Sequence, residues 1–468
     1  MIYSKKIRMR RIFLYAVVSC MLIVFPDDET SALLPPEHYR QDLLQACTLI
    51  ANNYIYLEDK LNISRNDFQQ ECLQWVQEMS FSTNPKQVFI HGIRQLRSRF
   101  ADGHFDWQLD KSLLDLAQIG ATSYRTLGLV LTTQGDKLVV AKVYPEDGLD
   151  EIQAGDQIVT WNGRDAQNAL THMCQFAPQS TAASSLEVAA RNLTLHTFKT
   201  PYRDQLSPVS CSYQNRDGDI RQLTLSWKSR DLTVSRWRSD KILLTRNLWL
   251  SLEELPATSD SLSNSLPFYV LDVETHRIVV LHPRDFMSWN ASDLERTMHR
   301  ILQEQPDYVL IDLKDTAGGG FQSVLALAHA LDVRQQFAFL YHGIDPETGI
   351  ELHEQQNFDW IARDIHIQNV WQGKVLFRTN ALCGSGCDFF IRWMQLQGRG
   401  DILGTPTAGR GGGTNDFYLS HTQTRLSFPV RDRILVGDSH SLEEHPVLPD
   451  VFCEKQLHSC LKQYFQHK

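Results

Sequence analysis

Two stretches in the carboxy-terminal half of the chain share one order of residues: an apolar run, a glycine-rich turn and an amphipathic segment. They are "DYVLIDLKDTAGGGFQSVLALAHAL" (residues 307–331) and "KVLFRTNALCGSGCDFFIRWMQLQG" (residues 374–398). A short apolar run that ends at glycine is typical of a buried strand, and apolar residues at three- and four-residue spacing are typical of a helix. Strands and helices that alternate in this way predict an α/β layer, with site loops at the carboxyl ends of the strands.

The pattern divides the rest of the chain into further blocks. Residues 35–115 have helical periodicity, and residues 118–228 contain short strands, a helical stretch near 165–197 and the hairpin turn "NRDGD". The α/β block then occupies residues 229–468, and a polar loop or linker, "SLEELPATSDSLSNSLP", lies within it.

The first 32 residues have the pattern of an export signal. Five cations in "MIYSKKIRMRR" precede a 14-residue apolar run, and the small-residue sequence "TSA" ends at Ala32. The run is shorter than the roughly 20 residues that span a bilayer. We therefore expect residues 1–32 to be a signal peptide and the protein to be exported, to a periplasm or the extracellular space. Lipid attachment at Cys20 and an uncleaved membrane anchor are the alternatives.

Composition narrows the classes of partner and cofactor. The net charge of −9 argues against nucleic acid as a partner. Eight cysteines remain after the signal segment, an even number that fits disulfides in an exported protein. Cys47 with Cys72, and Cys453 with Cys460, are the expected pairs. No cysteine or histidine spacing fits a zinc site, so we expect no metal and no diffusible cofactor.

The turn "NALCGSGCDFF" contains three candidate nucleophiles, Cys383, Ser385 and Cys387. If a helix begins at Gly386, Ser385 lies at its amino end, where free N–H groups favour negative charge. A serine there can attack a substrate, with the following N–H as an oxyanion donor and a second donor from the turn at residues 318–320. The alternative is that Ser385 only caps the helix. The two cysteines are expected to pack as small residues or to form a disulfide.

Three phrases in this order, "VLIDLKDTAGGG", "NALCGSGCDFF" and "ILGTPTAGRGGG", resemble the core of the carboxy-terminal processing (tail-specific) and tricorn-type serine peptidases. The resemblance implies a ClpP/crotonase-like α/β peptidase core and makes Ser385 the nucleophile. It places the oxyanion donors on the backbone N–H groups of Gly319 and Gly386, and Asp388 where the family often has glutamate.

In one branch of this family, the processing peptidases, the base is a lysine in the loop that follows the nucleophile. In this sequence that position matches Arg410, so the base has to be a different residue from the one in this lysine branch. Arginine stays protonated and cannot act as a base at neutral pH. The motif "FADGHFDW" resembles the tricorn branch and the branch of the chlamydial protease-like activity factor, which implies that His104 is the base. The phrase "SLEEHPVLPD" then implies Glu443 as the acid that orients the imidazole, with its neighbour Glu444 as the alternative.

Residues 118–228 resemble a PDZ domain through "TLGLVLT" and "IQAGDQIVTWNG". The resemblance implies an inserted PDZ-like β domain that captures chain ends by strand addition. Its carboxylate-binding loop would be Leu127, Gly128, Leu129 and Val130. A degenerate domain kept for packing is the alternative.

These expectations together describe an exported serine endopeptidase that cleaves unfolded or extended polypeptides through an acyl-enzyme. The rival is a catalytically inert peptide-binding protein that keeps both domains, and Arg410 favours it. A third alternative is a different acyl hydrolase on the same core. Self-association as a homodimer and membrane association through the N-terminal segment stay open.

Overall fold

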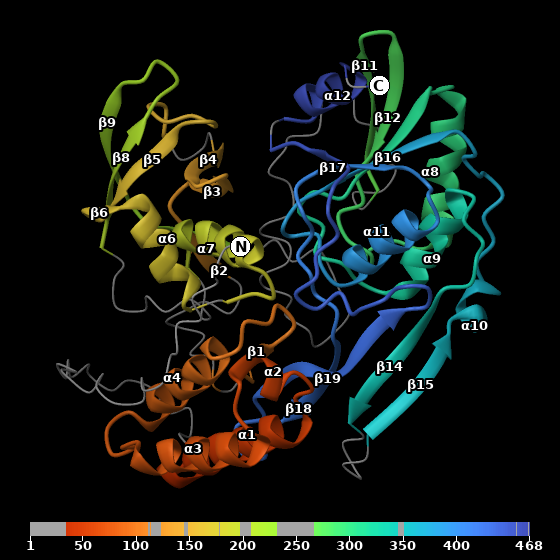
Figure 1. Ribbon diagram of the computed structural model, residues 1–468. Coiled ribbons are helices and arrows are strands. Elements are labelled where there is room, and N and C mark those ends of the chain that lie inside the picture. The colour runs from red at the N-terminus through yellow and green to blue at the C-terminus, as the bar shows by residue number, and fades with distance from the viewer. Residues whose placement is uncertain are drawn as a thin grey trace, which may run out of the picture. The chain divides into compact units, whose positions relative to one another are not determined.

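The computed structural model (Figure 1) describes most of the chain after residue 33. The predicted signal segment and most of the predicted linker lie outside the described residues. None of the described helices is long and apolar enough to cross a bilayer. The described residues are 34–110, 113, 123–144, 148–176, 178–196, 207–231, 266–344, 351–454, 456–466 and 468.

The N-terminal region is helical, as its periodicity predicts. Its helices pack around a shared apolar cluster, and the disulfide Cys47–Cys72 joins the first helix to the third. Phe428 and Val430 from the far end of the chain belong to the same cluster, so the helices pack on the peptidase core. The helices are α1 (Pro36–Asn53), α2 (Leu57–Leu61), α3 (Arg65–Glu78) and α4 (Pro85–Ser98).

The second block is a β domain with two helices. Its main sheet has the order β3-β4-β5-β8-β9, with β6 paired to β5, and the predicted "NRDGD" turn joins β8 to β9. A smaller sheet has the order β10-β2-β7. The elements are β2 (Ser123–Thr126), β3 (Leu129–Gln134), β4 (Lys137–Val143), β5 (Gln157–Trp161), β6 (Arg164–Asp165), α6 (Ala166–Cys174), α7 (Ala182–Thr194), β7 (Leu195–His196), β8 (Val209–Gln214), β9 (Ile220–Leu225) and β10 (Lys228–Asp231).

The third block contains the predicted α/β layer, a six-stranded sheet of order β11-β12-β13-β16-β17-β20. Only the β11–β12 pair is antiparallel. The strands are β11 (Phe268–Val273), β12 (His276–Leu281), β13 (Tyr308–Asp312), β16 (Lys374–Thr379), β17 (Asp401–Gly404) and β20 (Val451–Phe452). The helices are α8 (Ala291–Gln303), α9 (Phe321–Ala330), α10 (Asp359–Ala362), α11 (Gly386–Leu396) and α12 (Leu457–Gln466).

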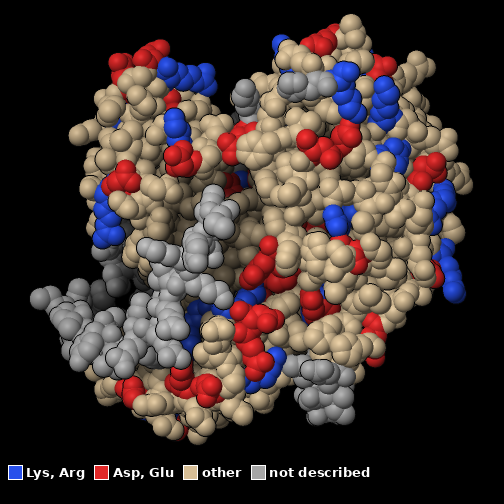
Figure 2. All heavy atoms as spheres, viewed as in Figure 1, with Lys and Arg blue, Asp and Glu red and all other residues tan. Residues whose placement is uncertain are grey.

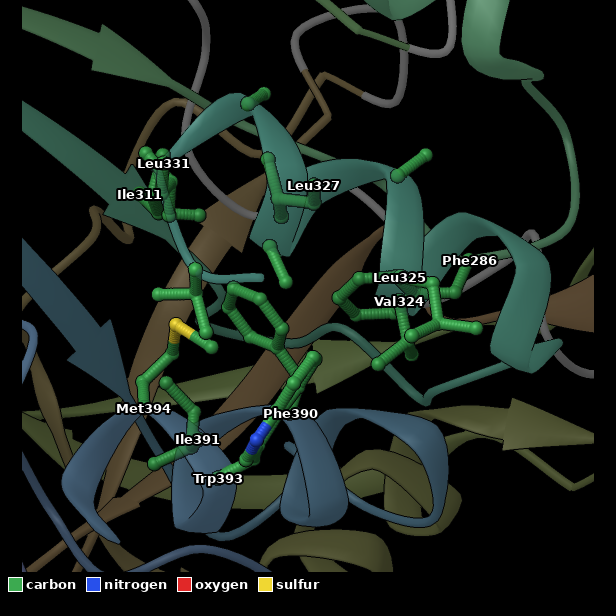
Figure 3. Close-up of a cluster of buried hydrophobic side chains, with 14 of the residues drawn as sticks. Phe286, Ile311, Val324, Leu325, Leu327, Leu331, Phe390, Ile391, Trp393 and Met394 are labelled. Atoms are coloured by element: carbon green, nitrogen blue, oxygen red, sulfur yellow. The ribbon is translucent and has the colours of Figure 1, made fainter. Parts of the chain in front are cut away.

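The period-2 geometry of strand β12 shows why both faces of this sheet are covered. Val279 belongs to the large cluster with α8, α9 and α11, whereas its neighbour Val280 belongs to the cluster with α12. Figure 3 shows the first cluster, where Leu327 of α9 and Phe390 and Met394 of α11 project into the space between the two helices. The two helices that follow the glycine turns are thus fixed against each other.

A second sheet was not predicted, and it brings the N-terminal region to the core. All its pairs are antiparallel, in the order β1-β19-β14-β15, with β18 also paired to β19. Strand β1 begins two residues after His104, and its Asp106 pairs with Ser427. The strands are β1 (Asp106–Gln108), β14 (Ala338–Ile344), β15 (Glu351–Asn357), β18 (Gly413–Tyr418) and β19 (Arg425–Leu435).

Candidate active site

Ser385 lies at the tight turn between strand β16 and helix α11, as the sequence predicts. Its φ of 58° and ψ of −123° are unusual for a residue with a side chain. Its backbone N–H donates to Asp388 Oδ2 at 3.0 Å, which holds the turn. The residue is half-buried, whereas Gly384 and Gly386 on either side are buried. The hydroxyl is therefore presented at the amino end of α11.

The glycine turn after β13 lies directly against this serine. A Cβ added to Gly318 would come within 2.2 Å of Gly384 O and 2.9 Å of Ser385 Cβ, and the φ of Gly318 is +93°. A Cβ on Gly386 would lie 3.0 Å from Gly319 N. Only glycine allows this approach of two backbones. The two predicted oxyanion donors, Gly319 and Gly386, are thus neighbours beside Ser385.

Asp388 joins the turn of Ser385 to the loop at residues 407–410. Its Oδ1 accepts from Gly409 N–H at 3.1 Å and its Oδ2 from Arg410 N–H at 2.9 Å. Burial raises the pKa of this carboxyl to about 6, although hydrogen bonds from Thr407 and the two amides oppose the rise. Asp388, which stands where the family often has glutamate, therefore holds the loops around Ser385 together.

His104 and Glu443, which are far apart in the sequence, meet in the structure. One carboxylate oxygen each of Asp102 and Glu443 and one ring nitrogen of His104 all lie within 4.8 Å of one another. The Glu443 side chain is 4% exposed, whereas that of Glu444 is 52% exposed and lies outside this group. The geometry favours Glu443 over Glu444 as the acid beside His104.

Asp102 is a part of this group to which the sequence assigned no role. Its Oδ1 accepts the backbone N–H of His104 at 2.7 Å, and its Oδ2 accepts the hydroxyl of Tyr54 at 2.8 Å. The carboxylate is completely buried and fixes the turn that carries His104. Its place in the motif "FADGHFDW" was the available signal.

Lys60 of α2 was also missed, and no sequence motif marks it. Its ammonium lies 2.7 Å from Glu443 Oε1. Burial, and then the negative charge of Asp102, raise the pKa of Glu443 to about 8, whereas Lys60 acts to lower it. Glu443 Oε2 also accepts the N–H of Gly411 at 3.1 Å. The ammonium at Glu443 makes this group a poor site for a metal cation, since like charges would be forced together.

The two halves of the site meet at Arg410. A Cβ on Gly103 would come within 2.2 Å of Arg410 Nε, and a Cβ on Gly384 would come within 2.9 Å of Arg410 Cδ. The turn of His104 and the turn of Ser385 therefore pack on the same side chain. Arg410 Nη2 also donates to Gln179 Oε1 at 2.8 Å. The arginine, which the resemblance matches to the lysine of the lysine branch, thus packs against both turns.

The predicted peptide-binding residues Leu127, Gly128, Leu129 and Val130 are all buried. The N–H of Leu127 donates to Thr194 O at 3.1 Å, and that of Gly128 donates to Thr126 Oγ1 at 3.2 Å. Helix α7 covers the nearby edge of β3, where the N–H of Thr133 donates to Glu187 at 2.9 Å. Peptide capture by these four residues stays a prediction.

Comparison with known proteins agrees with this architecture. Residues 277–452 match peptidase family S41, and residues 123–234 match a PDZ domain. The chain contains an S41 peptidase domain. The enzyme is of the serine peptidase type, and the predicted fold class, a peptidase core with an inserted PDZ-like domain and N-terminal helices, is confirmed.

Solved structures show the same fold over almost the whole chain. Mature CPAF superposes with a TM-score of 0.68 at 14% identity, over 92% of this chain and 95% of that one. Mature CPAF complexed with lactacystin gives 0.67 at 14% identity, over 92% and 97%. No curated protein sequence matches the chain.

Proposed function

We propose that the S41 domain of this chain is an exported serine endopeptidase that cleaves unfolded or extended polypeptides. Ser385 is the nucleophile, His104 the base and Glu443 the acid that orients the imidazole. The observation that carries the proposal is the pairing of two geometries. Ser385 lies in a strained turn against the Gly318–Gly319 backbone, and His104 lies within 4.8 Å of a buried carboxylate.

The proposed reaction begins when Ser385 Oγ attacks the carbonyl carbon of the scissile peptide bond and His104 takes the hydroxyl proton. The carbonyl oxygen becomes negatively charged, and the N–H groups of Gly319 and Gly386 stabilise it. The intermediate then expels the amine, which receives the proton from His104, and leaves an acyl-enzyme. Water hydrolyses the ester in the same manner. Glu443 stabilises the imidazolium that forms in each half of the reaction.

Export is supported by the N-terminal pattern and by the disulfides. The expected pairs Cys47–Cys72 and Cys453–Cys460 are present, and Cys383 and Cys387 form a third disulfide around Ser385. Disulfides persist in oxidising compartments such as a periplasm or the extracellular space. Attachment to a membrane is the alternative to a freely diffusing protein, and a homodimer is the alternative to a monomer.

Charged side chains of both signs are interspersed on the face that Figure 2 shows. This mixture and the net charge of −9 support a polypeptide rather than a nucleic acid as the substrate. The rival proposal of an inert peptide-binding protein is favoured by one observation, the arginine at the family's lysine position. The S41 match supports the serine-type peptidase, and the chemistry of Ser385 tests the rival directly.

Cleavage of casein by the wild type, Ser385→Ala and His104→Ala would test the proposal, with all three proteins shown to be folded. Cleavage by the wild type alone is the expected result. Reaction of the wild type with a serine-directed phosphonate, at Ser385 and not in Ser385→Ala, would separate the enzyme from an inert binder. A folded wild type that neither cleaves casein nor takes the label would refute the proposal.

A further inference from the structure

Lys60 joins the two segments that carry the base and its acid. Its ammonium lies 2.7 Å from Glu443 Oε1, 2.8 Å from Glu444 Oε1 and 2.6 Å from the carbonyl oxygen of Ala101. Ala101 belongs to the turn of His104, three residues before it. The Lys60 side chain is only 4% exposed. A buried lysine is costly unless its charge is paired, and here the partner lies at the candidate site.

The charges around Glu443 explain what this lysine contributes. Asp102 and Glu443 are both buried, and two carboxylates so close together resist simultaneous ionisation. Lys60 is the cation in contact with Glu443, and the pKa of Lys60 is itself raised despite its burial, mainly by Glu443. The other titratable or charged groups near the cluster are Tyr54, Tyr56, Arg97, His104, Arg410, Asp432 and Glu444.

We propose that Lys60 is a positioning residue for the reaction at Ser385: its ammonium fixes the Glu443 carboxylate beside His104 and balances one of the two carboxylates there. This inference rests on the proposed function, because it assigns no role to Lys60 apart from the Ser385–His104–Glu443 arrangement. Lys60 is not the base of the lysine branch, since it lies on α2 and not in the loop after the nucleophile.

A charge count shows why the balance matters. In the form with Glu443 ionised, the group of Lys60, Asp102 and Glu443 carries one net negative charge while His104 is neutral. The charge becomes zero when His104 takes the serine proton, so the cluster is suited to a transient imidazolium. With Lys60 in place the pKa of Glu443 is about 8, so only about a tenth of the molecules have this carboxylate ionised at pH 7. Without Lys60 that pKa would rise further, and the ionised fraction would fall. A neutral Glu443 could no longer stabilise the imidazolium as a carboxylate does.

The test compares the pH profiles of Lys60→Met and the wild type between about pH 6 and 10. Two rates are measured: kcat/KM for casein, and phosphonate labelling of Ser385. We expect both rates to be about tenfold or more lower in Lys60→Met than in the wild type at pH 7, and part of this loss to be recovered above pH 9. The reason is that each unit by which the pKa of Glu443 rises reduces the ionised fraction of its carboxyl about tenfold. Lys60→Arg, which keeps the charge, should retain the wild-type acid limb.

Glu444→Gln is the matched control, because it removes the exposed partner of Lys60 and leaves Glu443 in place. Its pH profile should follow that of the wild type. If Lys60→Met does not fold, Lys60→Gln serves as the neutral variant, since its amide can still donate to Ala101 O. If neither neutral variant folds, Lys60→Arg decides. A low-pH side of its rate profile that is shifted from that of the wild type rejects the inference.

A neutral variant that keeps the wild-type profile, or loses the same factor at every pH, would overturn the role of Lys60. The proposed function would still stand if Ser385→Ala is inactive. Cleavage that survives in Ser385→Ala would instead reject the proposed function. The two failures therefore have different signatures.

Discussion

Arg191 of helix α7 offers a sharp test of how the PDZ-like domain is attached to the peptidase core. Its side chain is 1% exposed, and its Nη2 lies 2.9 Å from Glu187 Oε1 and 2.6 Å from Asp315 Oδ1. Asp315 in turn accepts from Asn380 Nδ2 at 2.8 Å, at the start of the turn that carries Ser385. The substitution Arg191→Met should therefore affect both the stability of the chain and the geometry at Ser385.

The magnitude follows from the burial of the two carboxylates. The Glu187 and Asp315 side chains are 5% and 7% exposed, so neither can replace the lost guanidinium with bulk water. Removing one member of a buried ion pair costs about 3–5 kcal/mol, because a buried charge is left unpaired. We expect the free energy of unfolding to fall by about this amount in Arg191→Met, measured by urea denaturation followed by tryptophan fluorescence.

Arg296→Met is the matched control, since Arg296 also pairs with a carboxylate but is 59% exposed. Its cost should be about 0–1 kcal/mol. The triple variant Arg191→Met/Glu187→Gln/Asp315→Asn should recover part of the stability, because no buried charge then remains unpaired. A cost below about 1 kcal/mol for Arg191→Met alone would refute this reasoning.

Three further predictions concern the site and the N-terminal helices. Gly318→Ala should reduce casein cleavage by at least about 100-fold, because its Cβ would meet Gly384 O at 2.2 Å and displace an oxyanion donor; wild-type activity in this variant would contradict the predicted oxyanion site. Burial and Asp102 raise the pKa of Glu443 from 4.5 to about 8, so the folded chain holds a proton that the unfolded chain releases. Stability should therefore decrease as pH rises from 4.5 to 8, and Glu443→Gln should flatten that part of a plot of Tm against pH; an equal slope in both proteins would exclude this carboxyl as the cause. The double variant Cys47→Ala/Cys72→Ala removes a disulfide with a separation of 25 residues and should lose about 3.5 kcal/mol in urea denaturation, whereas no loss would contradict the entropic account.

The sequence predicted the parts of the fold that depend on local patterns. Strand β13 and helix α9, and strand β16 and helix α11, follow from a buried apolar run, a glycine turn and helical spacing. It also predicted the β-hairpin at "NRDGD" and two of the three disulfides. The second sheet was missed because its assembly depends on distant pairs: β1 and β14 both pair with β19, although β14–β15 and β18–β19 are neighbours along the chain.

The candidate site also has one part that local sequence patterns predict and another that depends on contacts between distant segments. Ser385 and the glycines around it lie in the turns that follow two neighbouring parallel strands, β13 and β16, so the local order of motifs was enough to bring them together. His104 and Glu443 were predicted from resemblance, and their contact depends on β1 pairing with β19 across most of the chain. Their catalytic roles, and peptide binding at Leu127–Val130, stay predictions.

The sequence alone determined the peptidase core and the turn of its serine, because strand, glycine turn and helix are set by residues within a few positions of one another. Only the tertiary structure decided how Lys60, Asp102 and Glu443 share one buried space and how Arg410 packs against the turns of His104 and Ser385. Buried charge interactions depend on distance and burial in three dimensions, and no spacing along the chain encodes either quantity.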